Sequence, residues 1–290
     1  MRMPDSQGAP MQLTLVRHLW GVPGDQIAAL PRFRDLGFGA IETPLTFLAP
    51  AAASAMVRAI ADLGLGLVIQ DFTCRWERNR SVDDHLASLR GILAAARPHA
   101  PVLVNIHGGS DHWPLAEMIR YHREAERIAA DFPVPVVHET HRSRCLYSPW
   151  ISREILEAVP GLRITADFSH WVVVAERCID DQPDILRLAA ERTVHVHARV
   201  GHSQGPQVPD PRAPEYAHEV AAHERWWDLV WDAQRARGQA VSWLTPEFGP
   251  APYLPHLPYA NVPVADLDAV CTWQAHRQRD RFRARFAAGG

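Results

Sequence analysis

Short runs rich in valine, isoleucine and leucine alternate along this chain with longer segments of helical periodicity, and the alternation repeats eight times. Such alternation is typical of βαβ units, which build a parallel sheet. The eight predicted strands are Gln12–His18, Ala40–Thr43, Gly66–Gln70, Val102–His107, Val134–Glu139, Arg163–Asp167, Thr193–His197 and Val241–Glu247. Because a TIM barrel typically takes about 250 residues, the 290 residues predict one (β/α)8 barrel spanning residues 1–290. Residues 1–10 are polar and are expected to form a flexible N-terminus.

Two long helices and two long loops are predicted in the C-terminal half. The helices are Glu215–Arg237 and a last one from Val264 to about Arg285. The last helix carries an arginine-rich run, Arg277–Arg285, for which a solvated helix face is the expectation. The proline-rich segments 199–214 and 249–263 would follow strands as loops. Loops of that length in compact domains are usually functional.

Composition limits the classes of function that this chain can have. The formal net charge of −3 gives no electrostatic reason to expect nucleic acid or a membrane surface as a partner. No apolar run approaches the length of a membrane span and no signal peptide is recognisable, so a cytoplasmic location is predicted. The four cysteines are scattered, which is consistent with reduced thiols. The sequence contains no lysine, and this excludes Schiff-base chemistry.

Five predicted strands end in side chains that bind metal ions or move protons. These side chains are His107, His138 with Glu139, Asp167, His195 with His197, and Glu247. In a parallel barrel all strand C-termini lie at the same face, so these side chains should converge. A single residue of this kind is more often a structural hydrogen-bond partner, but several strand ends together predict a site. A mixed set of histidine and carboxylate ligands suits one divalent ion, Mn²⁺, Mg²⁺, Co²⁺ or Zn²⁺.

In this order of ligands the chain resembles the xylose isomerase-like superfamily of sugar isomerases and epimerases, which includes the ketose 3-epimerases. In those epimerases one metal ion is held by a glutamate after the fifth strand, an aspartate after the sixth, a histidine after the seventh and a glutamate after the eighth. The residues at the matching positions are Glu139, Asp167, His197 and Glu247. The resemblance covers the whole chain. It implies the barrel fold, one divalent ion with Mn²⁺ favoured, and isomerase or epimerase activity on a carbohydrate.

The resemblance also implies which residues face the substrate. Glu42 and His107 fall where the superfamily places substrate-facing groups. The superfamily's Asp-x-x-His pattern appears as Asp167-Phe-Ser-His170. His170 is therefore expected to position a substrate hydroxyl or to tune Asp167.

The segment after the seventh strand departs from the epimerases, which carry a substrate-binding arginine in a short segment there. Here it reads Arg199-Val-Gly-His202-Ser-Gln204, so Arg199, His202 and Gln204 are candidate substrate contacts. Arg142 and Arg144, after the fifth strand, join Arg199 near the predicted mouth. Guanidinium groups at the mouth could bind a phosphate or carboxylate of the substrate. Salt bridges to neighbouring acids are the alternative.

The predicted chemistry is removal of a proton from a carbon next to a carbonyl. A metal ion that binds the carbonyl and the adjacent hydroxyl would stabilise the resulting enediolate. Two carboxylates on opposite sides of that plane could remove and return the proton. Glu139 and Glu247 are the candidate bases, and the alternative is that both are metal ligands only.

Four functions compete on the sequence alone. The first is a metal-dependent sugar isomerase or epimerase. A lyase or dehydratase on a keto-sugar or cyclitol would use the same ion with β-elimination, and the altered segment after His197 is the only hint towards it. An AP endonuclease-like hydrolase needs an Asp-x-His pair where this chain reads Asp210-Pro-Arg212. A non-catalytic sugar-binding barrel would not need both Glu139 and Glu247.

The expected partner of the chain is a small carbohydrate substrate. Neither nucleic acid nor a membrane is expected as a partner. A homo-oligomer is left open, with the tryptophans of the penultimate helix as the interface considered.

Overall fold

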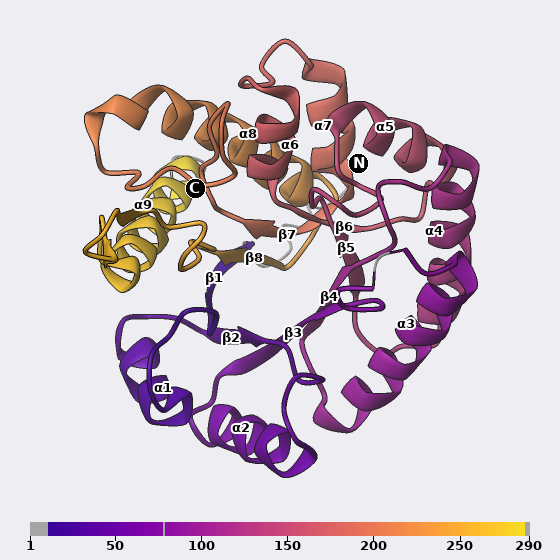
Figure 1. The fold of residues 1–290 in the computed structure, drawn as a ribbon, viewed down its shortest axis with the longest axis horizontal. Helices are drawn as coiled ribbons and strands as arrows, with labels where there is room; N and C mark the ends of the chain where they lie inside the picture. Colours follow the sequence, from indigo (N-terminus) through magenta and orange to yellow (C-terminus); the bar gives the residue numbers. More distant parts are fainter. Residues whose placement is uncertain (1–10, 78, 288–290) are drawn as a thin grey trace, which may run out of the picture.

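Eight parallel strands close into one barrel in the computed structural model, which describes residues 11–77 and 79–287 (Figure 1). The strands follow one another around the barrel in sequence order, and β8 closes it by pairing with β1. Their bounds are β1 Gln12–His18, β2 Ala40–Thr43, β3 Gly66–Phe72, β4 Leu103–His107, β5 Val136–Glu139, β6 Ile164–Ala166, β7 Thr193–His197 and β8 Val241–Thr245. The predicted (β/α)8 fold is confirmed. The N-terminus predicted to be flexible, residues 1–10, lies outside the described residues.

Helices surround the barrel (Figure 1). They are α1 Gln26–Asp35, α2 Pro50–Asp62, α3 Val82–Ala96, α4 Leu115–Ala129, α5 Pro149–Ala158, α6 Phe168–Ala175, α7 Pro183–Arg192, α8 Ala217–Ala236 and α9 Leu267–Ala287. Both α6 and α7 lie between β6 and β7, where simple alternation predicts one helix. Among the described residues no helix is long and apolar enough to cross a membrane. All four cysteines are free, as predicted.

Two strands end earlier than predicted, and each end has a local cause. β6 ends before Asp167 because this residue caps α6, accepting a 3.0 Å hydrogen bond from the backbone N–H of Ser169. β8 ends before Pro246 because proline has no N–H for the strand ladder. Asp167 and Glu247 therefore lie just beyond their strands, still at the C-terminal face of the barrel.

The inside of the barrel changes from apolar to polar along the strands. One residue from each of the first five strands joins a separate buried cluster, formed by Val16, Ala40, Val68, Leu103 and Val137. Side chains alternate between the two faces of a strand, so the residue two positions further along points to the same side. Those residues are polar and buried, and they are His18, Glu42, Gln70, Asn105 and Glu139. A polar layer therefore lies above the apolar layer, towards the strand C-termini.

The arginine-rich helix α9 is paired with acidic residues of α8 at intervals of one helical turn. The ion pairs are Arg277 with Glu224, Arg281 with Asp228, and Arg285 with Asp232. Arg277 and Arg285 stay exposed, as expected for a solvated face over 277–285, and the structure adds their pairing with α8. The sequence did not show this because the pairing depends on how two helices far apart in the chain pack together.

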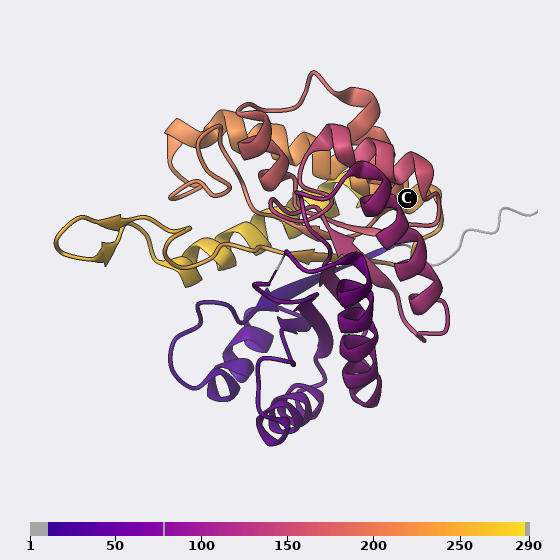
Figure 2. The same cartoon turned by 45° about the vertical axis from the view of Figure 1, so that its right-hand side comes forward.

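Two expectations for the C-terminal half are wrong. The tryptophans of α8, which are Trp226, Trp227 and Trp231, are buried and do not form an exposed subunit interface. The segment 249–263, predicted to be an irregular loop, contains a two-stranded hairpin of β9 (His256–Leu257) and β10 (Val262–Pro263). Figure 2 shows this hairpin projecting away from the barrel.

Replacing Glu224 with glutamine is expected to lower the free energy of unfolding by about 1–2 kcal/mol at pH 7. This is less than the loss for a fully buried pair because Arg277 is partly exposed to water. Burial raises the pKa of Glu224, but hydrogen bonds from Arg277 and Gln278 lower it overall. The contribution of the pair is therefore present above the unfolded-state pKa of about 4.3 and is lost as the pH falls through the lower folded-state pKa.

Thermal unfolding of wild type and variant at pH 7 and below pH 4 measures this difference. The matched control is Asp232→Asn in a more exposed pair, which should change stability by less than about 0.5 kcal/mol. Equal losses in the two variants, or a loss at Glu224 that is the same at both pH values, would contradict the prediction.

Candidate metal centre and active site

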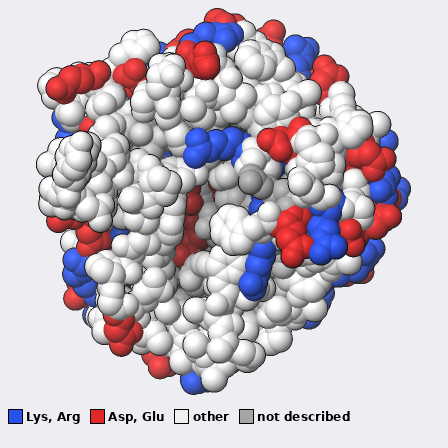
Figure 3. Space-filling model, viewed as in Figure 1, with Lys and Arg blue, Asp and Glu red and all other residues white. Residues whose placement is uncertain are grey.

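The C-terminal mouth of the barrel opens into a cavity of about 440 Å³, within the range of about 300–1,000 Å³ that small-molecule sites occupy. Its polar lining includes Gln70, His107, His141, Arg199 and Glu247. Its aromatic lining consists of Trp20, Phe47, Phe72, Trp76 and Tyr253. Figure 3 shows acidic atoms deep in a central hollow and basic atoms at its edge. A ligand in this cavity would contact both charged groups and aromatic rings.

The four predicted metal ligands meet at this mouth. Glu139, Asp167, His197 and Glu247 come from the C-terminal ends of β5, β6, β7 and β8, and all four are buried. One ligand atom from each residue lies within 4.8 Å of the others. Residues from four separate strands are thus close enough to bind one ion together.

The chemistry of this cluster fits a divalent cation. Two of its buried atoms, Glu139 Oε1 and His197 Nδ1, make no hydrogen bond within the described part of the chain, and buried polar atoms rarely stay unpaired. His197 Nδ1 does lie 3.0 Å from Glu247 Oε2, but without hydrogen-bond geometry. Burial lowers the pKa of His197, yet Glu247, Glu42 and Glu139 together raise it well above its usual value. The site therefore carries excess negative charge that a cation would balance.

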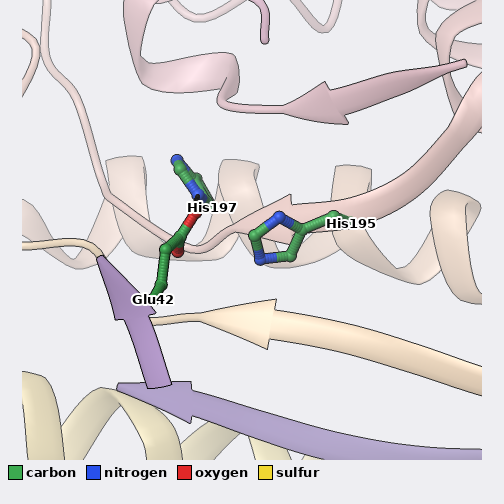
Figure 4. Close-up of side chains that lie close together, drawn as sticks. All are labelled: Glu42, His195 and His197. Atoms are coloured by element: carbon green, nitrogen blue, oxygen red, sulfur yellow. Dashed lines mark hydrogen bonds and ion pairs between the residues drawn. The ribbon is translucent and has the colours of Figure 1, made fainter. Parts of the chain in front are cut away.

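The carboxylate of Glu42 on β2 contacts the imidazole ring of His197 (Figure 4). Its two carboxylate oxygens lie 3.1 and 3.2 Å from Nε2 of His197, and Thr245 donates a 2.7 Å hydrogen bond to one of them. A carboxylate only accepts hydrogen bonds, so Nε2 carries a proton and Nδ1 is the atom left for a metal ion. The structure thus places Glu42 against a predicted metal ligand, whereas the resemblance implies a substrate-facing group.

A buried guanidinium shares two of the ligand carboxylates. Nη2 of Arg199 lies 2.5 Å from Asp167 Oδ2 and 2.7 Å from Glu247 Oε2. The same atom donates a 3.1 Å hydrogen bond to Nε2 of His170. Nη1 of Arg199 makes no hydrogen bond to any described residue, and the side chain lines the cavity. Arg199 therefore sits within the cluster with one nitrogen still available for a ligand.

These neighbours set the pKa values of the carboxylates differently. Burial raises the pKa of Asp167 to about 6, against the opposing effect of Arg199. The pKa of Glu247 is lowered despite burial, chiefly by His197 and then by Arg199. The pKa of Glu139 is lowered despite burial by His107 and His197. Glu139 and Glu247 are thus held as carboxylates, a state that suits metal ligands better than proton carriers.

Replacing Arg199 with glutamine is expected to tighten the binding of Mn²⁺ by about 10- to 100-fold. Two unit charges about 4 Å apart interact by about 4 kcal/mol at an effective dielectric constant of 20. Rearrangement of the surrounding side chains reduces the repulsion between the guanidinium and the ion to a fraction of that energy. Loss of the guanidinium also leaves Asp167 and Glu247 to repel each other in the ion-free protein. Both effects favour the ion-bound state.

Calorimetric titration with Mn²⁺ measures this change, and the melting temperature of the ion-free variant should fall. Arg142→Gln is the matched control. Arg142 has no ion pair among the described residues, and its guanidinium lies over the ring of Tyr253. If Arg199 served only to hold the ligands in place, its loss would weaken metal binding instead, and the prediction would be wrong.

Two histidines on the cavity wall lie close to Glu139. Nε2 of His107 is 2.8 Å from Glu139 Oε2, and the ring of His141 lies 4.7 Å from that of His107, between centroids. Nδ1 of His141 is 2.5 Å from the carbonyl oxygen of Arg142, which only accepts, so Nδ1 carries the proton and Nε2 keeps a lone pair. Burial, followed by the charge of His107, lowers the pKa of His141 well below its usual value. His141 is therefore a neutral proton acceptor at pH 7.

Two of the predicted substrate contacts lie beside the cluster. His170 is buried, and its Nε2 is 3.7 Å from Asp167 Oδ2, which is the tuning position considered for it. Arg142 is half-buried and lies over the ring of Tyr253, 5.1 Å from the centroid. Tyr253 belongs to the cavity wall, so Arg142 stands next to the cavity. Direct contact of His170 or Arg142 with a substrate stays a prediction.

Three other candidates do not belong to the described lining of the cavity. His202 and Gln204 contact each other through a 3.4 Å hydrogen bond from the backbone N–H of Gln204 to Nδ1 of His202. Neither is among the described residues that line the cavity, and their role as substrate contacts stays a prediction. Arg144 is buried and donates hydrogen bonds of 3.1 and 2.8 Å to the backbone carbonyls of Thr73 and Arg75. Its guanidinium joins loops together, contrary to the anion-binding role considered for it.

Sequence reasoning missed three polar residues of this site. Asn105 donates a 2.7 Å hydrogen bond to Glu139 Oε2, and Gln70 donates one of 3.0 Å to Glu247 Oε1. Both occupy inward positions of predicted strands, so the two-residue alternation of the strands could have revealed them. His141 was also missed, because it lies on a loop where no periodicity applies.

Comparisons with known proteins agree with the fold. Neither protein-family models nor curated protein sequences match this chain. A xylose isomerase-like TIM barrel protein from Mycobacterium smegmatis, solved in complex with magnesium, matches 92% of this chain and 95% of its own, with a TM-score of 0.61 and 13% identity. A sugar phosphate isomerase/epimerase from Parabacteroides distasonis matches 96% and 97%, with a TM-score of 0.60 and 9% identity. The probable 3-DHS dehydratase AsbF from Bacillus anthracis matches 92% and 99%, with a TM-score of 0.56 and 13% identity.

The predicted resemblance is thus confirmed at the level of the fold, which is that of the xylose isomerase-like TIM barrels. At such low identity the likeness extends to the fold alone. Solved structures with this fold include an epimerase, a dehydratase and an AP endonuclease. The choice of reaction therefore depends on the site of this chain itself.

Proposed function

We propose that this chain is a divalent-metal-dependent sugar isomerase or epimerase, which removes a proton from a carbon next to a carbonyl. The proposal is carried by the four-ligand cluster, whose two unpaired buried atoms lie at the mouth of the barrel beside a ligand-sized cavity. The magnesium complex of the Mycobacterium smegmatis protein supports it, and so does the likeness to the sugar phosphate isomerase/epimerase of Parabacteroides distasonis. Three carboxylates and one imidazole suit Mn²⁺, which is favoured, or Mg²⁺.

The ion would be held by Glu139, Asp167, His197 and Glu247. Bound there, it supplies a Lewis acid that polarises a carbonyl oxygen and makes the adjacent C–H more acidic. Glu139 and Glu247, the bases considered from the sequence, each accept hydrogen bonds from neighbouring side chains. We therefore assign these two carboxylates as ligands only.

We assign the role of the base to His141, whose Nε2 has a lone pair and whose ring lines the cavity. A neutral imidazole in the cavity can take a proton from carbon and return it to the neighbouring position. Nη1 of Arg199 can donate a hydrogen bond to a substrate oxygen as negative charge develops there. These two residues are thus proposed to complete the reaction site.

The substrate is proposed to be a small carbohydrate. The polar lining of the cavity can bind hydroxyl groups, and its aromatic lining can pack against the C–H face of a sugar ring. A cytoplasmic location fits the four free cysteines. The formal charge of −3 argues against nucleic acid as a substrate.

A metal-dependent lyase or dehydratase on a keto-sugar or cyclitol is the second candidate. The observation that favours it is that only His141 is assigned as a base, since the carboxylates are engaged by donors. Epimerisation that returns the proton to the opposite face needs a second acid there. β-Elimination needs one base, which takes the α-proton while the β-hydroxyl leaves, so that water and a conjugated carbonyl are formed.

The test is an NMR screen of keto-sugars, sugar acids and cyclitols in D₂O with protein that has been stripped of metal and reloaded with Mn²⁺. Deuterium at the carbon next to the carbonyl, with the hydroxyl groups retained, supports the isomerase or epimerase. Loss of a hydroxyl with a new conjugated carbonyl signal supports the lyase. If the stripped protein performs either reaction as well as the reloaded one, metal dependence is contradicted.

A further inference from the structure

The hairpin that follows the last barrel strand forms an uncharged arm, defined here as residues 255–264. Figure 2 shows β9 and β10 projecting from the barrel. From Gly249 to Ala265 the chain has no aspartate, glutamate, lysine or arginine, although charged residues make up 22% of the sequence. A long projecting segment without charges is unusual for a surface that faces only water.

The arm exposes its apolar side chains. Tyr259 at the tip is fully exposed, and Leu257 and Val262 are exposed by 53% and 50%. The turn nevertheless has a defined shape, since the backbone N–H of Asn261 donates a 2.9 Å hydrogen bond to the carbonyl of Leu257. An isolated two-stranded hairpin is marginally stable in water. A partner that covers these side chains would stabilise the arm.

A groove of about 670 Å³ lies at the base of the arm. Its apolar lining comes from the loop before α1, from α1, from the arm base and from α9, and includes Val22, Pro23, Ala29, Pro250, Leu254 and Leu267. Asp268 in the groove is paired with Arg17 at 2.9 Å and also with Arg32. Asp266, which also lines the groove, accepts hydrogen bonds from the backbone N–H groups at the start of α9. The groove therefore offers apolar walls and charged groups that are already engaged within the same molecule, which suits an uncharged occupant.

We infer that the arm of one molecule binds in this groove of a second copy of the same chain. Arm and groove lie side by side, so a two-fold axis near the arm base lets each arm enter the groove of the other molecule, and the contact is made twice. From Pro255 the tip is four residues away, a reach of about 13 Å at the rise of a strand. The arm can thus cross the boundary between two molecules. This inference does not depend on the proposed function.

The test is the mass of the intact protein in solution by sedimentation equilibrium, over about 1 to 100 µM, a range that detects dimers of micromolar affinity. The wild type should be a dimer. The double variant Leu257→Ser with Tyr259→Ser should raise the dimer dissociation constant by at least about 30-fold, as expected for loss of a buried aromatic anchor. Ala29→Arg, which fills the groove and leaves the arm intact, should have a similar effect.

The matched control is Trp150→Ser on α5, an exposed aromatic side chain on the opposite side of the barrel (Figure 1). It should leave the dissociation constant unchanged, and circular dichroism should show the same fold for all variants. The arm variant alone decides the outcome if Ala29→Arg does not fold. A monomeric wild type, or a dimer that persists in the arm variant, would overturn the inference.

Discussion

Replacing Glu139 with glutamine is expected to weaken Mn²⁺ binding by more than about 100-fold and to reduce kcat/KM to a similar or greater extent. Loss of a residue that only orients a metal ligand already costs about 10- to 100-fold. Glu139 Oε2 accepts hydrogen bonds from Asn105 at 2.7 Å and faces Nε2 of His107 at 2.8 Å, and Oε1 is unpaired. An amide must direct its NH₂ group either at these donors or at the ion, and both arrangements are unfavourable.

Calorimetric titration of the metal-free variant measures its affinity for Mn²⁺. The rate at which solvent deuterium enters the substrate measures the effect on catalysis. The matched control is Glu126→Gln, a half-buried glutamate on α4 whose pKa is raised by burial and which does not belong to the cluster. This control should bind Mn²⁺ like the wild type. If the Glu139 variant also retained wild-type affinity, Glu139 would not be a ligand and the four-ligand centre would be wrong.

Replacing His141 with glutamine is expected to lower kcat by about 10²- to 10⁴-fold, the usual contribution of a general base. Nε2 of this ring carries a lone pair because Nδ1 donates to the carbonyl of Arg142. The metal affinity should stay within about 2-fold of wild type, since His141 is outside the four-ligand set. Solvent deuterium should no longer enter the substrate at the wild-type rate.

His218→Gln is the matched control, because His218 is an exposed residue of α8, outside the described cavity lining. It should keep kcat within about 3-fold of wild type, as a residue outside the reaction site does. A normal exchange rate in the His141 variant would mean that the base is one of the two candidates from the sequence, Glu139 or Glu247. A parallel loss of metal affinity would show that His141 acts on the ligands instead of on the proton.

The order of strands and helices was predictable because each barrel strand is a short apolar run, buried on both faces and bounded by helical segments. β1, β2 and β7 have the predicted bounds, whereas β6 and β8 end early at a capping aspartate and a proline. Helix packing was not predictable. The arginines of α9 form ion pairs with α8, and the tryptophans of α8 are buried, because helices far apart in the chain pack together.

The ligand set was predictable for a related reason. In a parallel barrel the position of a residue along the chain also fixes the face at which it emerges, so strand-end residues such as Asp167 and His197 must lie at one mouth. The ligand order of the epimerases that the chain resembles then pointed to Glu139 and Glu247 as the other two members of the predicted set. The sequence by itself therefore determined the barrel and the four side chains that meet there.

The tertiary structure alone decided what surrounds these side chains. Glu42 contacts Nε2 of His197, Arg199 joins Asp167 to Glu247, and His141 lines the cavity. These contacts join distant strands to loops, and their directions depend on how loops pack over the mouth. Strand alternation fixes which residues face inward, but it carries no information on where a loop side chain points, because a loop has no repeating geometry.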